Sequence, residues 1–180
     1  DRDIAELWME MRTYGHIDGE NHPAVGSAAR DMMDRPDEEA GSVLSTAKSY
    51  LALYRDPIVA HNISRSEFNI RDLMHHEQPV SLYIVTQPND KARLRSLVRI
   101  MVNMIVRLLA DKMDFKNGRQ VAHYKHRLLL MLDEFPSLSK LEILQESLAF
   151  VAGYGIKCYL ICQDINQLKS RETGYGHDES

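Results

Sequence analysis

Three short apolar runs in the second half of the chain, separated by helical patterns, most constrain the fold. The runs are VSLYIVT (residues 80–86), LLLML (residues 128–132) and IKCYLIC (residues 156–162). Apolar residues at helical spacing predict a helix over residues 94–109 and another over residues 139–152. Almost continuously apolar strands that alternate with helices are typical of parallel sheets. The sequence therefore predicts an α/β fold with a parallel βαβαβ sheet.

The predicted helix over residues 139–152 has its own start signal and apolar face. Ser139 and Glu142 have the spacing of a capping box, which would begin the helix at Ser139. The positions predicted to face the core are Leu141, Leu144, Leu148 and Val151.

The first half of the chain differs in pattern and in charge. Its apolar residues recur at helical spacing near residues 4–11, 23–33 and 43–54, and no strand is predicted before residue 78. Residues 1–78 hold 8 Lys/Arg against 15 Asp/Glu, whereas residues 79–180 hold 14 against 11. We therefore predict an all-helical domain over residues 1–72 and an α/β domain over residues 73–180.

The composition excludes several classes of protein. A chain of 180 residues with 44% apolar and 27% charged residues has the make-up of one or two globular domains. Two cysteines are too few for a disulfide scaffold, and no apolar run approaches the roughly 18 residues of a membrane span. A net charge of −4 argues against a protein that coats nucleic acid non-specifically.

The strongest functional signal is the segment LLLMLDEFPS, residues 128–137. Its apolar strand leads to two adjacent carboxylates, Asp133 and Glu134, and ligands of parallel α/β sheets collect at the carboxyl ends of the strands. One carboxylate there can hold Mg²⁺ through its waters, and a second can polarise an attacking water. This is the Walker B pattern of P-loop NTPases. The alternative is a strand that ends in a solvated acidic turn.

Gln163 follows the third apolar run, IKCYLIC. Many P-loop ATPases place a polar residue at the tip of the strand after the Walker B strand, where it senses the γ-phosphate or orients water. The alternative is a glutamine that caps the next turn, a role that Asp164 or Asn166 would serve equally.

A phosphate-binding loop is missing from the sequence. The pattern GxxxxGK[ST] does not occur, since none of the nine glycines is followed by lysine. Either this loop lies upstream of Asp1 or the domain is not an ATPase. We therefore expect no tight binding of ATP or Mg²⁺ and no ATP hydrolysis by this chain alone.

The chain resembles the coupling proteins of bacterial conjugation and type IV secretion, the TraG family. The resemblance is close from about residue 42 to residue 180 and weak over the first 40 residues. It depends on the motifs DEFPSL, GYGIKCYLICQD and YRDP, which are more specific than a generic ATPase pattern.

The resemblance implies a fold, an activity and a cellular setting. Members of this family are ATPases whose RecA-like domain carries an inserted helical domain that is tied to substrate recognition. They are anchored at the cytoplasmic face of the bacterial inner membrane as homo-hexamers. They link the relaxase and relaxosome, or secreted effectors, to the type IV secretion channel, and are thought to drive transfer of single-stranded DNA or protein. Mg²⁺ and ATP are their cofactors.

The resemblance also assigns roles by matched position. Asp133 corresponds to the Mg²⁺ acid, Glu134 to the catalytic carboxylate and Gln163 to the γ-phosphate sensor. Ser139 departs from the family pattern, because relatives commonly have glycine there, and the capping box suggests that this change is tolerated. No arginine lies between Lys140 and Lys169, so an arginine finger stays unassigned.

Two charged clusters are further candidates for binding. Lys91, Arg95 and Arg99 share one side of a predicted helix and are candidates for a DNA-facing or subunit-facing surface, the alternative being a solvated helix face. Three acidic residues, Asp37, Glu38 and Glu39, are candidates for binding a cationic partner.

Three functions remain open from the sequence. The chain is part of an ATPase that drives conjugative DNA transfer, or a recognition module for a relaxase or effector without activity of its own. The third reading is an unrelated α/β scaffold in which Asp133 and Glu134 are structural.

Overall fold

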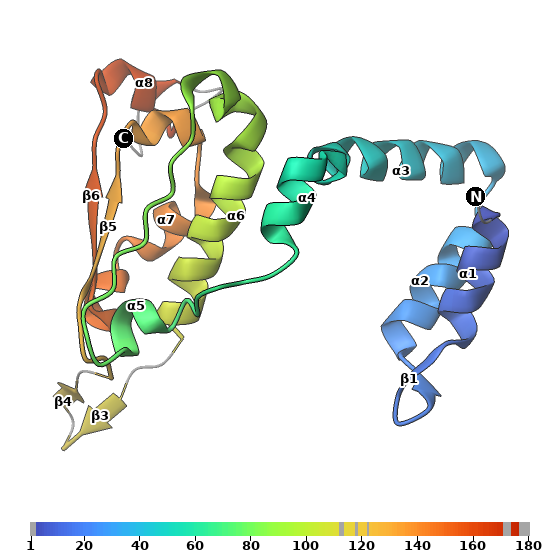
Figure 1. The fold of residues 1–180 in the computed structure, drawn as a ribbon, viewed down its shortest axis with the longest axis horizontal. Helices are drawn as coiled ribbons and strands as arrows, with labels where there is room; N and C mark the ends of the chain where they lie inside the picture. The colour runs from blue at the N-terminus through green and yellow to red at the C-terminus, as the bar shows by residue number, and fades with distance from the viewer. Residues whose placement is uncertain (1–2, 112–113, 118, 122, 171–173, 177–180) are drawn as a thin grey trace. The chain divides into compact units, whose positions relative to one another are not determined.

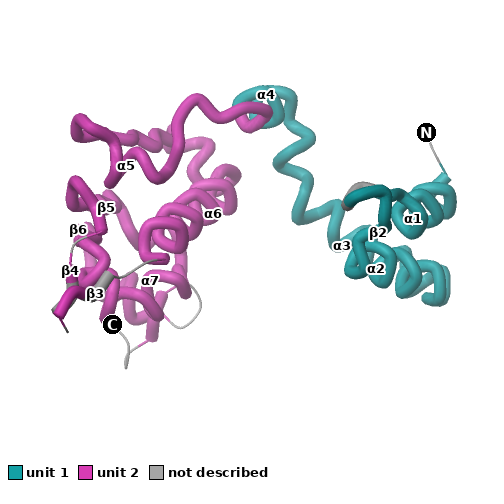
Figure 2. The backbone as a smooth tube through the Cα atoms, turned by 90° about the horizontal axis from the view of Figure 1, so that it is seen from below, with its two compact units in different colours: residues 1–62 teal, residues 63–180 magenta. Residues whose placement is uncertain are grey.

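The structure divides into two compact units. The computed structural model describes residues 3–111, 114–117, 119–121, 123–170 and 174–176. Unit 1 comprises residues 1–62 and unit 2 comprises residues 63–180, as Figure 2 shows. The division between the units falls earlier in the chain than the boundary at residue 72 that the sequence predicted.

Unit 1 is mainly helical. Its elements are α1 (Ile4–Thr13), β1 (Gly15–Ile17), β2 (Glu20–Asn21), α2 (Pro23–Met33), α3 (Asp37–Tyr50), η1 (Ala52–Arg55) and α4 (Pro57–Ile63), of which the last ends at the boundary. Helices α1, α2 and α3 overlap the three predicted segments, whereas α4 was not predicted. Helices α1 and α2 lie side by side (Figure 1). Of the described side chains in this unit, only Ala29 and Val59 are buried.

The hairpin of β1 and β2 was not predicted. The two strands pair antiparallel, and Asp18 and Gly19 between them have φ values of 52° and 83°. Asp-Gly in a left-handed turn is a strong local signal for a two-residue hairpin. The signal was therefore present, but the strands that flank it are too short to show an alternating pattern.

Unit 2 contains the predicted parallel strands. Its elements are α5 (Asp72–His75), η2 (Pro88–Asp90), α6 (Lys91–Leu109), β3 (Asp114–Lys116), β4 (Arg119–Val121), β5 (Leu128–Leu132), η3 (Phe135–Leu138), α7 (Glu142–Ser147), η4 (Val151–Tyr154), β6 (Ile156–Leu160) and α8 (Ile165–Lys169). Strand β5 pairs parallel with β6, from Leu128 opposite Ile156 to Leu132 opposite Leu160. The mixed α/β class and this parallel pair are confirmed.

The core of unit 2 lies on one side of the β5–β6 pair. Figure 1 shows α6 and α7 on that side. Val102 and Val106 of α6, Leu144 of α7, Leu130 of β5 and Ile156 of β6 belong to one buried cluster. The long amphipathic helix that the sequence predicted therefore covers the sheet as expected.

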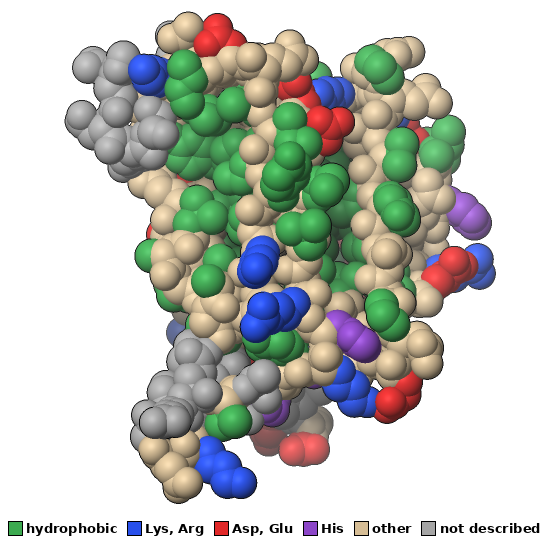
Figure 3. Space-filling model, turned by 90° about the vertical axis from the view of Figure 1, so that its left-hand side faces the viewer, with side chains coloured by type: hydrophobic (Ala, Val, Ile, Leu, Met, Phe, Trp, Pro, Cys, Tyr) green, Lys and Arg blue, Asp and Glu red, His purple; other side chains and the backbone are tan. Residues whose placement is uncertain are grey.

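The other face of the β5–β6 pair is open. Leu129, Met131 and Tyr159 are exposed by 55%, 57% and 55%. Figure 3, which views the molecule from the side where these strands lie in Figure 1, shows hydrophobic side chains gathered on this face. Parallel strands usually have both faces covered. Among the described residues, only one face is covered.

Two predicted elements differ from the structure. Residues 80–86 are extended but pair with no described strand, so the parallel sheet of the described residues has two strands and not three. The helix predicted over residues 139–152 is only α7, Glu142–Ser147, followed by the short turn η4. Leu148, which was predicted to face the core, is 44% exposed because the helix has already ended.

Candidate active site

The parallel pairing of β5 and β6 brings two polar side chains into contact. Asp133 and Glu134 follow the last residue of β5, and Gln163 lies just beyond β6. Nε2 of Gln163 donates a hydrogen bond to Oε2 of Glu134 over 2.7 Å. The carboxyl ends of parallel strands meet at one edge of a sheet, so this contact follows from the topology.

Backbone hydrogen bonds hold these two ends together beyond the strands. The N–H of Ile161 donates to the carbonyl of Leu132 over 3.1 Å, and the N–H of Phe135 donates to the carbonyl of Ile161 over 2.8 Å. Between them the chain turns at Glu134, which has φ 55° and ψ 50°. A left-handed backbone is uncommon for a residue other than glycine and often marks a functional site.

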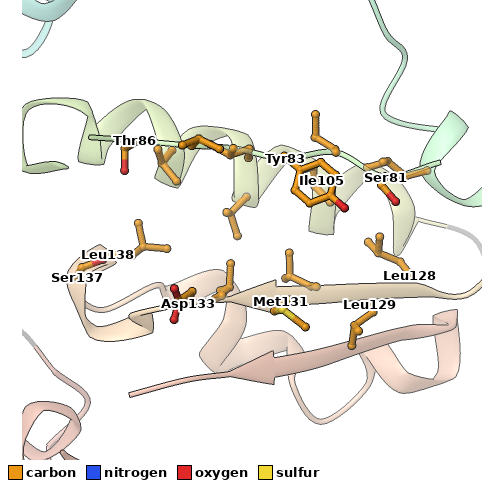
Figure 4. Close-up of a pocket in the computed structure, with 18 of the residues that line it drawn as sticks. Ser81, Tyr83, Thr86, Ile105, Leu128, Leu129, Met131, Asp133, Ser137 and Leu138 are labelled. Atoms are coloured by element: carbon orange, nitrogen blue, oxygen red, sulfur yellow. The ribbon is translucent and has the colours of Figure 1, made fainter. Parts of the chain in front are cut away.

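Asp133 is exposed and lines a cavity of about 570 Å³. The cavity lies between the extended residues 80–86 and β5, and Figure 4 shows Thr86 and Ser137 near the same end as Asp133. A carboxylate with nearby hydroxyls offers the oxygen ligands that Mg²⁺ takes. In the part of the chain that the structure describes, no three His, Cys, Asp or Glu side chains gather into a metal site. The donor set thus fits a Mg²⁺ ion that takes most of its ligands from water and phosphate.

An aromatic pair anchors the loop that follows Glu134. Phe135 is buried, and its ring stacks on that of Tyr175 at 5.5 Å between centroids. The Tyr175 hydroxyl accepts a hydrogen bond of 3.0 Å from the N–H of Leu141. Burial raises the pKa of Tyr175, while this bond and the charge of Arg99 act in the opposite direction. No pattern in the sequence pointed to Tyr175, which lies 40 residues from Phe135 in the chain.

The capping box predicted at Ser139 is wrong. Helix α7 begins at Glu142, and its cap residue Leu141 makes no side-chain capping bond. Ser139 itself has φ 56° and ψ −171°, a conformation that strongly favours glycine. A serine here is therefore strained.

Two of the three basic candidates on α6 contact the loop after Glu134. Nη1 of Arg99 donates to the carbonyl of Leu138 over 2.5 Å, and Nη1 of Arg95 donates to Oγ of Ser139 over 3.3 Å. Lys91 and Arg95 also line the cavity beside Asp133. Neither arginine is fully exposed, so the alternative of a solvated helix face does not describe them. Contact with DNA stays a prediction.

The acidic candidates lie in unit 1. Asp37, Glu38 and Glu39 are exposed and form the first turn of α3, and Glu39 pairs with Arg35. Negative side chains stabilise the amino-terminal end of a helix, which gives these residues a local structural role. Their role in binding a partner stays a prediction.

The described helices include none that is both long enough and apolar enough to cross a membrane.

The whole chain, residues 1–180, matches the family model described as Type IV secretory system Conjugative DNA transfer. It is 87% identical over 179 residues to a conjugal transfer protein TraG from Escherichia coli, and 86% identical to a second TraG from the same species. These alignments cover 99% of this chain but 28% of each relative. A VirD4 protein from Agrobacterium fabrum is 31% identical over 155 residues, which are 82% of this chain and 22% of that protein. The chain therefore belongs to the conjugative DNA transfer family of type IV secretory systems and spans little more than a quarter of the TraG proteins that it matches.

Proposed function

We propose that unit 2 carries the catalytic carboxylate of an ATPase that drives conjugative DNA transfer. The observation that supports this most is the contact between Glu134 and Gln163, with Asp133 beside it, at the carboxyl ends of two parallel strands. This edge is where ligands of α/β sheets bind. Membership of the conjugative DNA transfer family supplies the process to which hydrolysis would be coupled.

Each of the three side chains has a distinct proposed role. Asp133 would hold Mg²⁺ through its water ligands, and this ion would supply charge neutralisation for the phosphates. Glu134 would accept a proton from the attacking water. The amide of Gln163 keeps the Glu134 carboxylate at the strand edge, where the γ-phosphate of ATP would lie, and would respond to its presence.

The phosphate-binding loop would come from another part of the longer protein. GxxxxGK[ST] is absent from these 180 residues, and the TraG relatives are more than three times as long. We propose a complete RecA-like domain in that longer protein, with unit 1 as its inserted helical domain. This chain alone would not turn over ATP.

The proposed setting follows from the family. The longer protein would act as a homo-hexamer at the cytoplasmic face of the inner membrane and connect the relaxosome to the secretion channel. Single-stranded DNA with its relaxase, or a secreted protein, would be its substrate.

Metal dependence of ATP turnover in the longer polypeptide tests this proposal. Asp133→Asn should lower turnover by about tenfold or more and raise the Mg²⁺ concentration that gives the half-maximal rate. The reason is that a neutral amide holds Mg²⁺ and its water ligands more weakly than a carboxylate does. Asp34→Asn, at an exposed position after α2, is the matched control and should leave both values unchanged. The same Mg²⁺ dependence in both variants would contradict the proposal.

A recognition function of unit 1 is the second candidate. The exposed acidic turn of Asp37, Glu38 and Glu39 is the observation that favours it, since a cationic partner is attracted to such a surface. Neutralising all three residues should weaken binding of a relaxase to the longer protein and flatten its salt dependence. Unchanged binding and salt dependence would remove this candidate.

A further inference from the structure

The two arginines of α6 that contact the 134–139 loop are about one helical turn apart. Arg99 donates to the Leu138 carbonyl over 2.5 Å, and Arg95 donates to Ser139 Oγ over 3.3 Å. Hydrogen bonds from a charged donor are stronger than neutral ones. A single helix therefore supplies two charge-assisted contacts to the loop that begins with Glu134.

This loop has a strained backbone at both ends. Glu134 has φ 55° and Ser139 has φ 56°. A residue other than glycine in such a region costs about 1–3 kcal/mol and persists only where the surroundings impose it. Inside the loop, the N–H of Ser137 bonds the carbonyl of Glu134 over 2.9 Å, and that of Ser139 bonds the carbonyl of Pro136 over 2.9 Å. These bonds join residues of the loop to one another, so they fix its shape. Its position relative to the rest of unit 2 depends on contacts with residues outside the loop.

The outside contacts act at opposite ends of the loop. Phe135 is held in the core beside Tyr175, close to Glu134. At the far end, Leu138 and Ser139 are held by the two arginines. Because Phe135 is fixed in the core, the path of the loop from Glu134 onward depends on the position of Leu138 and Ser139 at its other end.

We infer that Arg95 and Arg99 are positioning residues for the Glu134 carboxylate. They fix Leu138 and Ser139 at the far end of the loop. This in turn maintains the left-handed turn at Glu134 and keeps the Glu134 carboxylate within hydrogen-bond distance of Gln163. A displacement of α6 would therefore reach the Glu134–Gln163 pair through this loop. The inference depends on the proposed hydrolytic role of Glu134 and gives these arginines a role other than contact with DNA.

Arg99 is the stronger of the two contacts. Its bond to a backbone carbonyl is 2.5 Å long, against 3.3 Å for that of Arg95. Nε of Arg95 is buried and has no hydrogen-bond partner among the described atoms, so this guanidinium is only partly satisfied. Loss of the Arg99 contact should consequently have the larger effect on turnover.

The test compares kcat and KM for ATP in the longer polypeptide. Arg99→Gln should lower kcat by about tenfold, since misplacing a catalytic group by a fraction of an ångström reduces rate steeply, while KM changes less than about twofold. Arg99→Lys, which keeps the charge and a hydrogen-bond donor, should have a smaller loss of kcat than Arg99→Gln. Arg93→Gln is the matched control, because Arg93 is exposed on the same helix and pairs with Asp90.

Two further variants make the outcome decisive. In a Glu134→Gln background, Arg99→Gln should have no additional effect on kcat, because both changes act through one carboxylate. If Arg99→Gln prevents folding, Arg95→Gln makes the same test, with an expected loss of about threefold in kcat.

The possible results separate the inference from the proposed function. An unchanged kcat in the folded arginine variant, together with strong loss in Glu134→Gln, overturns the inference alone. An equal loss in Arg93→Gln also overturns it, since no hydrogen bond joins Arg93 to the loop among the described residues. An unchanged turnover in Glu134→Gln overturns the proposed function on which the inference rests.

Discussion

The amide of Gln163 and the carboxylate of Glu134 lie 2.7 Å apart although 29 residues separate them in the chain. The pairing of β5 with β6 creates this contact, because each side chain follows the end of one strand. Two functional candidates named from the sequence thus share one hydrogen bond.

The first prediction concerns the charge at position 163. Gln163→Glu places a second carboxylate where an amide now donates to Glu134, and two close carboxylates share a proton. ATP turnover of the longer polypeptide should fall at neutral pH and recover as the pH rises. Gln163→Leu, which removes the donor without adding charge, should lower turnover at every pH. A pH profile of Gln163→Glu that parallels the wild type would contradict the role of this contact.

The second prediction concerns Gly155, at the turn into β6. Its φ is 82°, and a Cβ atom there would lie 2.4 Å from the ring of Tyr124. Gly155→Ala should destabilise the protein by about 1–3 kcal/mol, as measured by denaturant unfolding.

Gly41 provides the control for this substitution. It lies within α3, and a Cβ atom there would have no neighbour within 4 Å. Gly41→Ala should stabilise the protein by about 0.5–1 kcal/mol. Equal effects of the two substitutions would show that the close approach of Tyr124 to Gly155 has no consequence for stability.

The third prediction compares the contributions to stability of two leucines, both of which lie in the helix predicted over residues 139–152. Leu144 is fully buried, whereas Leu148 is 44% exposed. Leu144→Ala should reduce the free energy of unfolding by about 2–5 kcal/mol, because it leaves a cavity in the core. Leu148→Ala should change it by less than about 1 kcal/mol. A continuous helix to residue 152 would instead make both substitutions costly.

The fourth prediction concerns the pH dependence of the cap on α8. Asp164 accepts hydrogen bonds from the backbone and side chain of Asn166, which lower the pKa of its carboxyl. A lowered pKa in the folded state adds stability above the ordinary carboxyl pKa, and this is lost as the pH falls through the folded value.

Denaturant unfolding at a series of pH values measures this effect. The stability of the wild type relative to Asp164→Ala should be constant above about pH 5 and should shrink as the pH falls below that value and through the lowered pKa of the folded state. Asp164→Asn keeps a capping oxygen that does not titrate, so its stability relative to Asp164→Ala should stay constant. A constant difference for the wild type would contradict the assignment.

The sequence predicted those parts of the fold that depend on local pattern. The apolar runs at residues 128–132 and 156–162 became β5 and β6, and the long amphipathic stretch became α6. Residues 80–86 have the same apolar pattern but form no ladder with any described strand, because a strand also needs a partner at the right distance. Pattern alone does not specify that partner.

The residues of the candidate site could be predicted from the sequence, but the contacts that hold them in place could not. Asp133, Glu134 and Gln163 could be chosen because each follows an apolar strand. The hydrogen bond from Arg99 to Leu138 could not be predicted, since it joins residues 39 positions apart and depends on how α6 packs. Spacing likewise suggested a capping box at Ser139, where the backbone adopts a conformation that only the structure reveals.

ATP turnover of the longer polypeptide with Glu134→Gln tests the central claim most directly. The substitution keeps the size of the side chain and removes its basicity, so turnover should fall by about 10² or more while bound nucleotide is retained. Glu142→Gln, at an exposed glutamate that begins α7, is the control and should leave turnover unchanged. Undiminished turnover in Glu134→Gln would show that Glu134 is a structural acid, and the Walker B interpretation would be wrong.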